Sequence, residues 1–141
     1  MGVYYIIVND SKGEFIDPFD FNEDVKLAGL LGGVHGSAVR DLLVFTDSIP
    51  KDRQLGRWSG DKIRIHGDHF GPERAEIFQN YQNISFELMA YLYEMYAYHR
   101  AEIEQTLKED QRIRTKLLGI LNPEIHVNLA YKLRLLGLIG P

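Results

Sequence analysis

The segment from Asn83 to Leu107 contains neither Gly nor Pro, and it constrains the fold of this chain more than any other feature of the sequence. Its apolar side chains recur at spacings of three or four residues, which is the period of an amphipathic helix. Asn83 or Ser85 is placed to cap the first turn. The pattern therefore predicts one long helix. Its apolar stripe comprises Ile84, Leu88, Tyr91, Met95 and Tyr98.

Two shorter helical patterns follow the long one. Residues 110–121 have Asp110 at the position of an N-cap. Asn122 and Pro123 predict the start of a further helix, because Pro is favoured at the first helical position. The apolar stripe of this last helix comprises Ile125, Leu129, Leu133 and Leu136. Residues 83–141 are therefore expected to form a helical unit of about three helices.

The first half of the chain has the pattern of strands and turns. Residues 3–9 are mostly β-branched or aromatic and are apolar at successive positions, which predicts a central strand covered on both faces. Residues 10–13, DSKG, are typical of a turn, and residues 14–18 follow as a return strand, so a β-hairpin is expected. Residues 75–82 predict one more short strand.

Short helices are expected between these strands. Residues 24–31 carry apolar side chains at helical spacing, and the glycine-rich segment 32–37 is expected to end that helix. Ser37 is placed as the N-cap of a second helix over residues 37–45. A glycine-rich loop before a helix can also hold phosphate on its backbone amides, but this one lacks the Lys of a P-loop. A connecting turn is the simpler interpretation.

Taken together, these patterns predict an α+β fold with a small antiparallel β-sheet and short helices, followed by the helical unit. We expect the sheet region over residues 1–82 and the helical region over residues 83–141, packed on the sheet or joined to it in one compact domain. The 141 residues are enough for either arrangement.

Composition excludes several kinds of chemistry. The chain has no Cys, so it cannot form disulfides, iron–sulfur clusters or thiolate zinc sites, and it has no cysteine nucleophile. The net charge of −4 argues against a general nucleic-acid binder. No apolar run approaches the about 20 residues of a membrane span, and the first residues lack the pattern of a secretory signal. A cytoplasmic protein without a cofactor is expected.

Residues 56–72, GRWSGDKIRIHGDHFGP, combine turn residues with an alternating pattern. We expect a hairpin in which residues 59–61 and 67–68 form turns. Trp58, Ile63 and Ile65 are expected in the core, because alternate residues of a strand share a face. The same alternation predicts that Lys62, Arg64 and His66 face water.

The polar residues at the end of this segment raise a metal-binding alternative. His66, Asp68 and His69 offer nitrogen and oxygen ligands within four residues, and His35, Asp61 or Asp47 would have to complete the set. The chain would then be a metal-dependent hydrolase or a phosphate- or nucleotide-binding module. The simpler interpretation is that Asp68 bonds its own turn and that both imidazoles lie at the surface.

Residues 56–68 have the spacing Gly-x-Trp-x-Gly-Asp-x-Ile-x-x-x-Gly-Asp, and residues 4–17 read YYIIVNDSKGEFID. In these features the chain resembles a group of small uncharacterised bacterial proteins, which begin with an apolar strand, an Asn and a Lys-x-Glu hairpin. The resemblance covers residues 3–90 and implies a bacterial or phage origin but no activity. His66 and His69 stand where the group has apolar and Tyr-like residues, which weakens the metal hypothesis. The helical tail beyond Tyr93 looks like an addition, which favours a partner of its own.

Tyrosine is concentrated in the predicted long helix. Tyr91, Tyr93, Tyr96 and Tyr98 lie within eight residues, together with Met95. Tyr combines a large apolar ring with a polar tip and is enriched at protein interfaces. The helix is apolar around most of its circumference, so some of these side chains are expected to face a partner rather than the core. We therefore expect a non-enzymatic protein that binds a protein partner or another copy of itself through this Tyr-rich helix.

A basic tail offers a further alternative. Residues 111–141 carry five Lys and Arg against one acid, Glu124. Such a surplus is most often a solvated helix face, so nucleic acid is not the expected partner. Contact with nucleic acid would use Arg112, Arg114, Lys116, Lys132 and Arg134.

Overall fold

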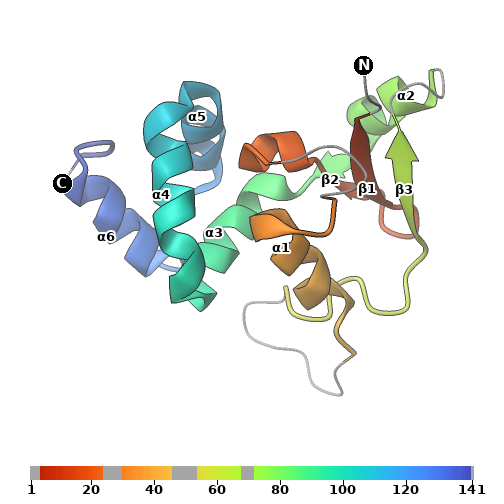
Figure 1. Cartoon of the computed structure of the whole chain (residues 1–141), viewed down its shortest axis with the longest axis horizontal. Helices are drawn as coiled ribbons and strands as arrows, with labels where there is room; N and C mark the ends of the chain where they lie inside the picture. The colour runs from red at the N-terminus through yellow and green to blue at the C-terminus, as the bar shows by residue number, and fades with distance from the viewer. Residues whose placement is uncertain (1–3, 24–29, 46–53, 68–71, 141) are drawn as a thin grey trace. The chain divides into compact units, whose positions relative to one another are not determined.

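A computed structural model describes residues 4–23, 30–45, 54–67 and 72–140 of the chain (Figure 1). The chain divides into two compact units, Met1–Ser85 and Phe86–Pro141. The first unit contains a four-stranded sheet with short helices, and the second is helical in its described residues. The predicted α+β fold class is confirmed.

The sheet has the strand order β3-β1-β2-β4. The strands are β1 (Tyr5–Asn9), β2 (Glu14–Ile16), β3 (Ile63–Gly67) and β4 (Gln82–Asn83). β1 pairs with β2 and β3 in antiparallel register, and the predicted hairpin is present. The prediction of a purely antiparallel sheet is wrong in one detail, because β4 runs parallel to β2. A parallel neighbour needs a crossover, and helix α2 (Glu73–Asn80) lies just before β4 in the chain.

The central strand β1 is buried on both faces, as its sequence predicts. Ile6 and Val8 point to one face, where they form a cluster with Phe15 of β2 and Ile77 of α2. Ile7 points to the other face and is only 1% exposed. Burying both faces of β1 makes this strand the centre of the first unit.

Two predictions in the first unit are wrong at the level of single elements. Residues 75–80 of the strand predicted over 75–82 lie in helix α2, and only Gln82 is in a strand, β4. The acids Glu73 and Glu76 in the first turn of α2 interact favourably with the helix dipole. Helix α1 (Gly33–Leu43) starts four residues before Ser37, whose hydroxyl donates to the carbonyl of Gly33 instead of capping the helix. Of the helix predicted over residues 24–31, residues 24–29 lie outside the described part of the chain. The remaining short element is the 3-10 helix η1 (Pro18–Phe21).

The segment around Trp58 is a series of turns followed by β3, not a hairpin of two strands. Trp58 is fully buried as predicted. The predicted faces of β3 are wrong: Ile65 is 46% exposed, whereas His66 is 4% exposed. The reason is the register, since His66 pairs with Ile6 and so lies on the face that α2 covers.

The second unit contains four α-helices in its described residues. These are α3 (Ser85–Met95, which begins at the last residue of the first unit), α4 (Arg100–Glu109), α5 (Gln111–Ile120) and α6 (Val127–Leu135). The predicted single helix to Leu107 is wrong, because the chain is extended at Tyr96 and forms a short 3-10 helix, η3 (Ala97–His99), before α4. Side chains make this break without Gly or Pro: Arg100 Nε and Nη2 donate to the last carbonyls of α3, those of Tyr93 and Glu94, at 2.7 and 3.1 Å.

The ends of the later helices follow local rules. Asp110 caps α5 as predicted, and its side chain accepts from the amide of Ile113 at 3.1 Å. Pro123 lies in the turn before α6 rather than at its first position. α6 ends at Leu135, and a Schellman motif follows at Gly137 (φ 71°). Its two backbone bonds run from the amide of Gly137 to the carbonyl of Arg134 and from the amide of Leu138 to the carbonyl of Leu133.

Candidate functional site

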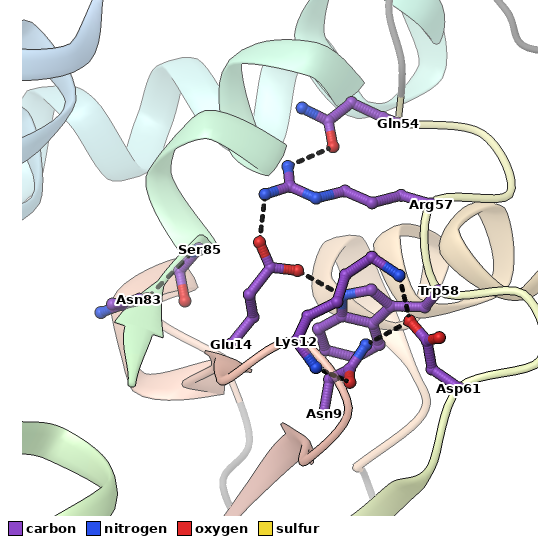
Figure 2. Close-up of polar contacts among 9 residues, drawn as sticks. All are labelled: Asn9, Lys12, Glu14, Gln54, Arg57, Trp58, Asp61, Asn83 and Ser85. Atoms are coloured by element: carbon purple, nitrogen blue, oxygen red, sulfur yellow. Dashed lines mark hydrogen bonds and ion pairs between the residues drawn. The ribbon is translucent and has the colours of Figure 1, made fainter. Parts of the chain in front are cut away.

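Residues 56–68, which have the Gly-x-Trp-x-Gly-Asp spacing and are called the signature below, contribute polar side chains that bond to the β1–β2 hairpin. Glu14 on β2 is buried, and its Oε1 accepts from Trp58 Nε1 at 2.9 Å. The other oxygen of Glu14 pairs with the guanidinium of Arg57, which also donates to Gln54 Oε1 at 3.0 Å. Figure 2 shows this carboxylate between the indole and the guanidinium. The charge of the buried Glu14 carboxylate is thus matched by one cation, Arg57, and one neutral donor, Trp58.

A second set of contacts joins the same two segments. Asn9 Nδ2 donates to Asp61 Oδ2 at 2.9 Å, and Lys12 Nζ forms an ion pair with the same oxygen (Figure 2). Asn9 Oδ1 accepts from the backbone amide of Lys12 at 2.9 Å. The hydrogen bond from Lys12, followed by that from Asn9, lowers the pKa of Asp61 below its ordinary value. Asp61 is therefore held as a carboxylate at neutral pH.

These two sets of contacts explain two positions of the signature, Trp58 and Asp61. Arg57, Trp58 and Asp61 of the signature bind the Asn, Lys and Glu side chains of the hairpin. These hydrogen bonds and ion pairs therefore join two segments that are far apart in the sequence. This arrangement supports a role in folding for the most recognisable part of the sequence, because the polar atoms that could act on a substrate are bonded to each other.

A second polar cluster lies on the α2 side of the sheet. Arg64 on β3 makes two bonds to Asp10, from Nε at 2.7 Å and from Nη2 at 3.2 Å, and its Nη1 lies 2.7 Å from Glu73 Oε1. The hydroxyl of Tyr81 donates to Asp10 Oδ1 at 2.9 Å. The bond from Arg64 lowers the pKa of Asp10, although burial opposes it. His66 Nε2 lies 3.5 Å from Glu73 Oε2, at the edge of this cluster.

The structure describes only some of the residues that were predicted to bind a metal. Asp68 and His69, and Asp47 that could have completed the set, lie outside them. Among the described residues, no group of three or more His, Asp or Glu side chains is arranged to hold a metal ion. His35 and His66 have different partners. His66 lies next to Glu73. In His35, Nδ1 bonds to Glu23 and Nε2 bonds to the carbonyl of Leu30.

The glycine-rich segment is the first turn of α1, and its anion position is filled by the chain itself. Glu23 Oε2 accepts from the amide of Val34 at 2.8 Å, and Oε1 accepts from the amide of His35 at 2.8 Å. Oε1 also lies 2.9 Å from His35 Nδ1. A Cβ on Gly33 would come within 2.0 Å of this carboxylate, which explains the glycine. Glu23 thus occupies the place that a bound phosphate would take.

Sequence reasoning missed Glu23, because it lies ten residues before the helix that it caps. Burial raises the pKa of this carboxyl, but hydrogen bonds from the His35 ring and from the amides of His35 and Val34 outweigh burial and lower it. A carboxylate that accepts several N–H bonds at a helix N-terminus is stabilised in its charged form. No local pattern in the sequence could have joined these positions.

The tyrosines of the predicted long helix separate into two groups. Tyr91 and Tyr93 are 5% and 3% exposed, so they belong to the interior. The Tyr93 hydroxyl donates to Glu104 Oε2 at 3.1 Å, and the guanidinium of Arg100 lies 5.3 Å from the centre of the Tyr93 ring. Burial and the nearby Glu104 carboxylate raise the pKa of Tyr93 to about 12. These contacts tie α3 to α4.

The other group lies at the break between α3 and α4. Tyr98 is 66% exposed and Met95 is 50% exposed, while Tyr96 is half-buried. The Tyr98 ring lies 4.3 Å from the buried His99 ring and 5.5 Å from the Tyr96 ring, centre to centre. We call Met95, Tyr96 and Tyr98 the Tyr98 surface. Three of the five predicted interaction residues therefore lie at the surface, and they lie where the helix stops rather than along it.

The basic residues of the tail are partly engaged within the second unit. Arg114 Nη1 donates to the carbonyl of Leu107 at the end of α4, at 3.0 Å, and Lys132 Nζ lies 3.3 Å from Glu104 Oε1. Arg100 and Arg114 thus play the same part, since each reaches back seven residues to the end of the preceding helix. These contacts give two of the five basic residues a structural role.

No protein-family model, curated protein or solved structure matches this chain. In the part of the chain that the structure describes, the helices are too short and too polar for any of them to cross a bilayer. The candidate site that remains is the Tyr98 surface. It combines large exposed rings with a fixed backbone, whereas the polar clusters of the first unit are bonded internally.

Proposed function

We propose that this chain is a non-enzymatic cytoplasmic protein that binds another protein through the Tyr98 surface. The observation that carries the proposal is the state of Tyr98, whose ring is 66% exposed and yet rests on the buried ring of His99 at 4.3 Å. Tyr is one of the residue types that most often dominate the energy of protein interfaces. A large exposed ring of this kind supports an interaction surface.

The side chains of the Tyr98 surface are held in place by their neighbours, which favours binding. Less side-chain conformational entropy is then lost when a partner binds. Ordering a flexible side chain at an interface costs about 0.5–1.5 kcal/mol. Tyr98 contacts both His99 and Tyr96 through tilted rings, and His99 meets Tyr96 edge-on at 6.2 Å. The mutual contacts of the three rings reduce this cost before binding.

The backbone beneath the rings is also fixed. Arg100 bonds to the carbonyls of Tyr93 and Glu94 at the end of α3, and its guanidinium lies over the Tyr93 ring. Charge-assisted bonds of this kind are stronger than bonds between neutral groups. The break that presents Tyr98 is therefore a defined turn, which supports its use as a recognition feature.

Site-specific photo-crosslinking tests the proposal in cells that naturally produce this chain. A photoreactive phenylalanine analogue replaces Tyr98 in one variant and Tyr4 in the control, because Tyr4 is an aromatic residue of similar exposure (50%) in the first unit. We expect a discrete crosslinked protein at position 98 and not at position 4. The same products at both positions, or none at position 98, would contradict the proposal.

Affinity measurements with the captured protein then test the ring itself. Tyr98→Ala should weaken binding at least about tenfold, which corresponds to about 1.4 kcal/mol. Tyr98→Phe keeps the ring and its contacts with Tyr96 and His99, so it should retain most of the affinity. Equal affinities for Tyr98→Ala and the wild type would place the interface elsewhere.

A metal-dependent hydrolase is the second candidate function, supported by the closeness of His66 Nε2 to Glu73 Oε2. His66 also directly precedes Gly67 and the sequence Asp68-His69. Elemental analysis of the purified chain tests this alternative, together with the change in melting temperature on adding Zn²⁺ or Mn²⁺. A bound metal that is lost in His66→Ala would support it. No bound metal and an unchanged melting temperature would remove it.

A further inference from the structure

The turn that leads into α6 is closed by the side chain of His126. The amide of Asn122 donates to His126 Nδ1 at 3.0 Å, and the amide of His126 donates to the carbonyl of Asn122 at 2.7 Å. The amides of Glu124 and Ile125 also donate to Asn122, to its side chain and to its carbonyl. We propose that residues 122–126 form an acid-sensitive hinge, which holds α6 in place while His126 is neutral and releases it when His126 takes up a proton. We call this turn the His126 hinge.

The bond from Asn122 determines the protonation state of the imidazole. A backbone N–H can only donate, so His126 Nδ1 must accept with its lone pair. His126 is therefore the neutral tautomer that carries its proton on Nε2. An imidazolium carries a proton on both ring nitrogens and has no acceptor. Protonation of His126 therefore breaks the bond that closes the turn.

The place of His126 in the helix adds to this effect. His126 is the N-cap of α6, and its carbonyl accepts from the amide of Ala130 at 2.9 Å, where the helix begins. The positive end of the helix dipole lies at the N-terminus, so a cation is unfavourable there. A proton on His126 thus weakens the first turn of α6 as well as the turn before it.

Glu94 at the end of α3 attaches the same end of α6 to the rest of the unit. Its Oε1 accepts from the amide of Asn128 at 2.9 Å and from the side chain of Asn128 at 3.1 Å. Its Oε2 accepts from the amide of Leu129 at 2.8 Å. An imidazolium is attracted to Glu94, and it competes with these donors for the carboxylate. The two attachments of α6 therefore weaken together when His126 is protonated.

The charges around His126 do not compensate for its protonation. Burial is the first cause of a lowered pKa of His126, and attraction to Glu94 and Glu87 of α3 only partly opposes it. The other charged residues of the turn and of α6 are Glu124, Lys132 and Arg134. Glu124 is exposed, and Lys132 Nζ is paired with Glu104 at 3.3 Å.

The direction of the pH dependence follows from the lowered pKa of His126. The unfolded chain takes up the proton first as the pH falls, so the contribution of His126 to stability is fully present at neutral pH. This contribution is lost as the pH falls below about 6.5, the ordinary pKa of His. Glu side chains titrate near pH 4 and stay charged over most of this range. Release of α6 exposes the side of the helix that is buried at neutral pH, which comprises Leu129, Ala130 and Leu133.

NMR of the imidazole nitrogens in the wild-type chain tests the protonation state directly. A long-range ¹H–¹⁵N spectrum at about pH 7.5 should show His126 with a proton on Nε2 and none on Nδ1. A proton on Nδ1 at this pH, alone or together with one on Nε2, would overturn the proposal. This measurement needs no variant, so it does not depend on the folding of a mutant.

Hydrogen exchange of the full chain tests the release of α6. Protection factors, which are corrected for the intrinsic effect of pH on exchange, are compared at about pH 7.5 and about pH 5.5, on either side of the ordinary pKa of His. Protection of residues 127–135 should fall by about threefold to tenfold, because one proton contributes no more than about tenfold at one pH unit below 6.5. Protection of α4 should stay the same. Unchanged protection of α6, or an equal fall in α4, would contradict a local hinge.

Two variants assign the effect to His126. Asn at position 126 offers an oxygen that can accept from Asn122 but does not titrate, so His126→Asn should keep α6 protected at both pH values. Glu124→Gln is the matched control, since it removes the acid of the same turn and should show the same fall as the wild type. A fall that persists in His126→Asn, or that is lost in Glu124→Gln, would refute the role of His126. Circular dichroism checks that both variants are helical.

This inference does not depend on the proposed partner of the Tyr98 surface. His126→Asn should leave crosslinking at position 98 unchanged at neutral pH, and Tyr98→Ala should leave the pH dependence of α6 protection unchanged. The failure of one proposal is therefore distinguishable from the failure of the other.

Discussion

The two units of this protein use their most distinctive residues in opposite ways. In the first unit, Arg57, Trp58 and Asp61 of the signature are buried or half-buried and bond to the β1–β2 hairpin, as in the contact of Arg57 and Trp58 with Glu14. In the second unit, no motif is apparent, yet large side chains such as Tyr98 and Tyr131 are more than half exposed. A segment that stands out in the sequence is here a segment that holds the fold together.

The contrast has a physical origin. Buried polar groups must meet partners with defined geometry, so they fix residue types and spacings that are easy to recognise. An exposed apolar surface needs only area and shape, and many sequences can supply them. The comparison therefore predicts that substitutions in the first unit mainly change stability, whereas those on the surface of the second unit mainly change association.

The largest expected effect is that of Glu14→Ala. Removing this carboxylate takes one acceptor from the guanidinium of Arg57 and the Glu14 acceptor from the indole N–H of Trp58. The loss of one partner from a buried ion pair costs about 3–5 kcal/mol. Urea unfolding followed by the fluorescence of Trp58, the only Trp, reports on the first unit. Glu76→Ala removes an exposed acid and should change the unfolding free energy by about 0.5 kcal/mol or less. Equal effects of the two substitutions would show that the buried Glu14 contacts contribute no more to stability than an exposed acid does.

Gly33→Ala should have the next largest effect. The residue has φ 69°, and its new Cβ would displace the Glu23 carboxylate that caps α1. Gly60→Ala is the matched control, because Gly60 has φ 78° but no described atom within 4 Å of an added Cβ. Placing an L-residue at a positive φ costs about 1–2 kcal/mol, and this cost is common to both substitutions. Gly33→Ala should exceed Gly60→Ala by about 1 kcal/mol for the lost cap, again by Trp58 fluorescence. No difference would mean that Glu23 contributes little to stability.

Asp110→Ala should destabilise the second unit by about 1 kcal/mol, because the cap of α5 is lost. Asp110→Asn retains an oxygen that can accept from Ile113 and should cost much less. Thermal unfolding followed by circular dichroism at the helix band measures both variants. An effect as large as that of Glu14→Ala would show that the second unit also depends on a single buried polar contact.

Tyr93 should make the second unit sensitive to alkaline pH. Burial is the first cause of the raised pKa, about 12 against an ordinary 10, so the unfolded chain ionises this Tyr first. The stability that the folded chain gains from the raised pKa of Tyr93 is present below pH 10 and is lost as pH rises towards 12. Urea unfolding at several alkaline pH values should show a flatter decline for Tyr93→Phe than for the wild type. Parallel curves would indicate that Tyr93 is not buried.

Tyr98→Ala should have the smallest effect on stability. Its ring is mostly exposed, so the unfolding free energy should change by about 0.5 kcal/mol or less while partner binding is lost. This outcome would show that Tyr98 contributes to association and not to folding. A destabilisation of several kcal/mol would instead make Tyr98 a structural residue.

The sequence predicts those parts of the fold that depend on local patterns. The hairpin of β1 and β2, the burial of Trp58 and the cap at Asp110 follow from residue types and their neighbours. The order of strands does not, because the crossover that makes β4 parallel to β2 depends on how α2 packs on the sheet. The buried face of β3 depends in the same way on pairing with β1.

The candidate site was harder to predict for a related reason. The predicted interaction residues included Tyr91 and Tyr93, which are buried, because helical spacing alone does not show which side of a helix is covered. The break at Tyr96 depends on Arg100 reaching back to α3, and neither Gly nor Pro marks it. Glu23 and His35 meet only in the folded chain.

The contacts between the hairpin and the signature also mean that the hairpin is synthesised well before the residues to which it bonds. Asn9 and Asp61 are bonded although fifty-two residues separate them. Ribosomes add roughly 5–20 residues per second, so the hairpin waits roughly 3–10 s for the segment that completes it. During that interval β1 lacks its neighbour β3, and an unpaired strand edge is a template for aggregation. We expect the polar side chains of Asn9, Lys12 and Glu14 to keep this end of the nascent hairpin hydrated until their partners emerge.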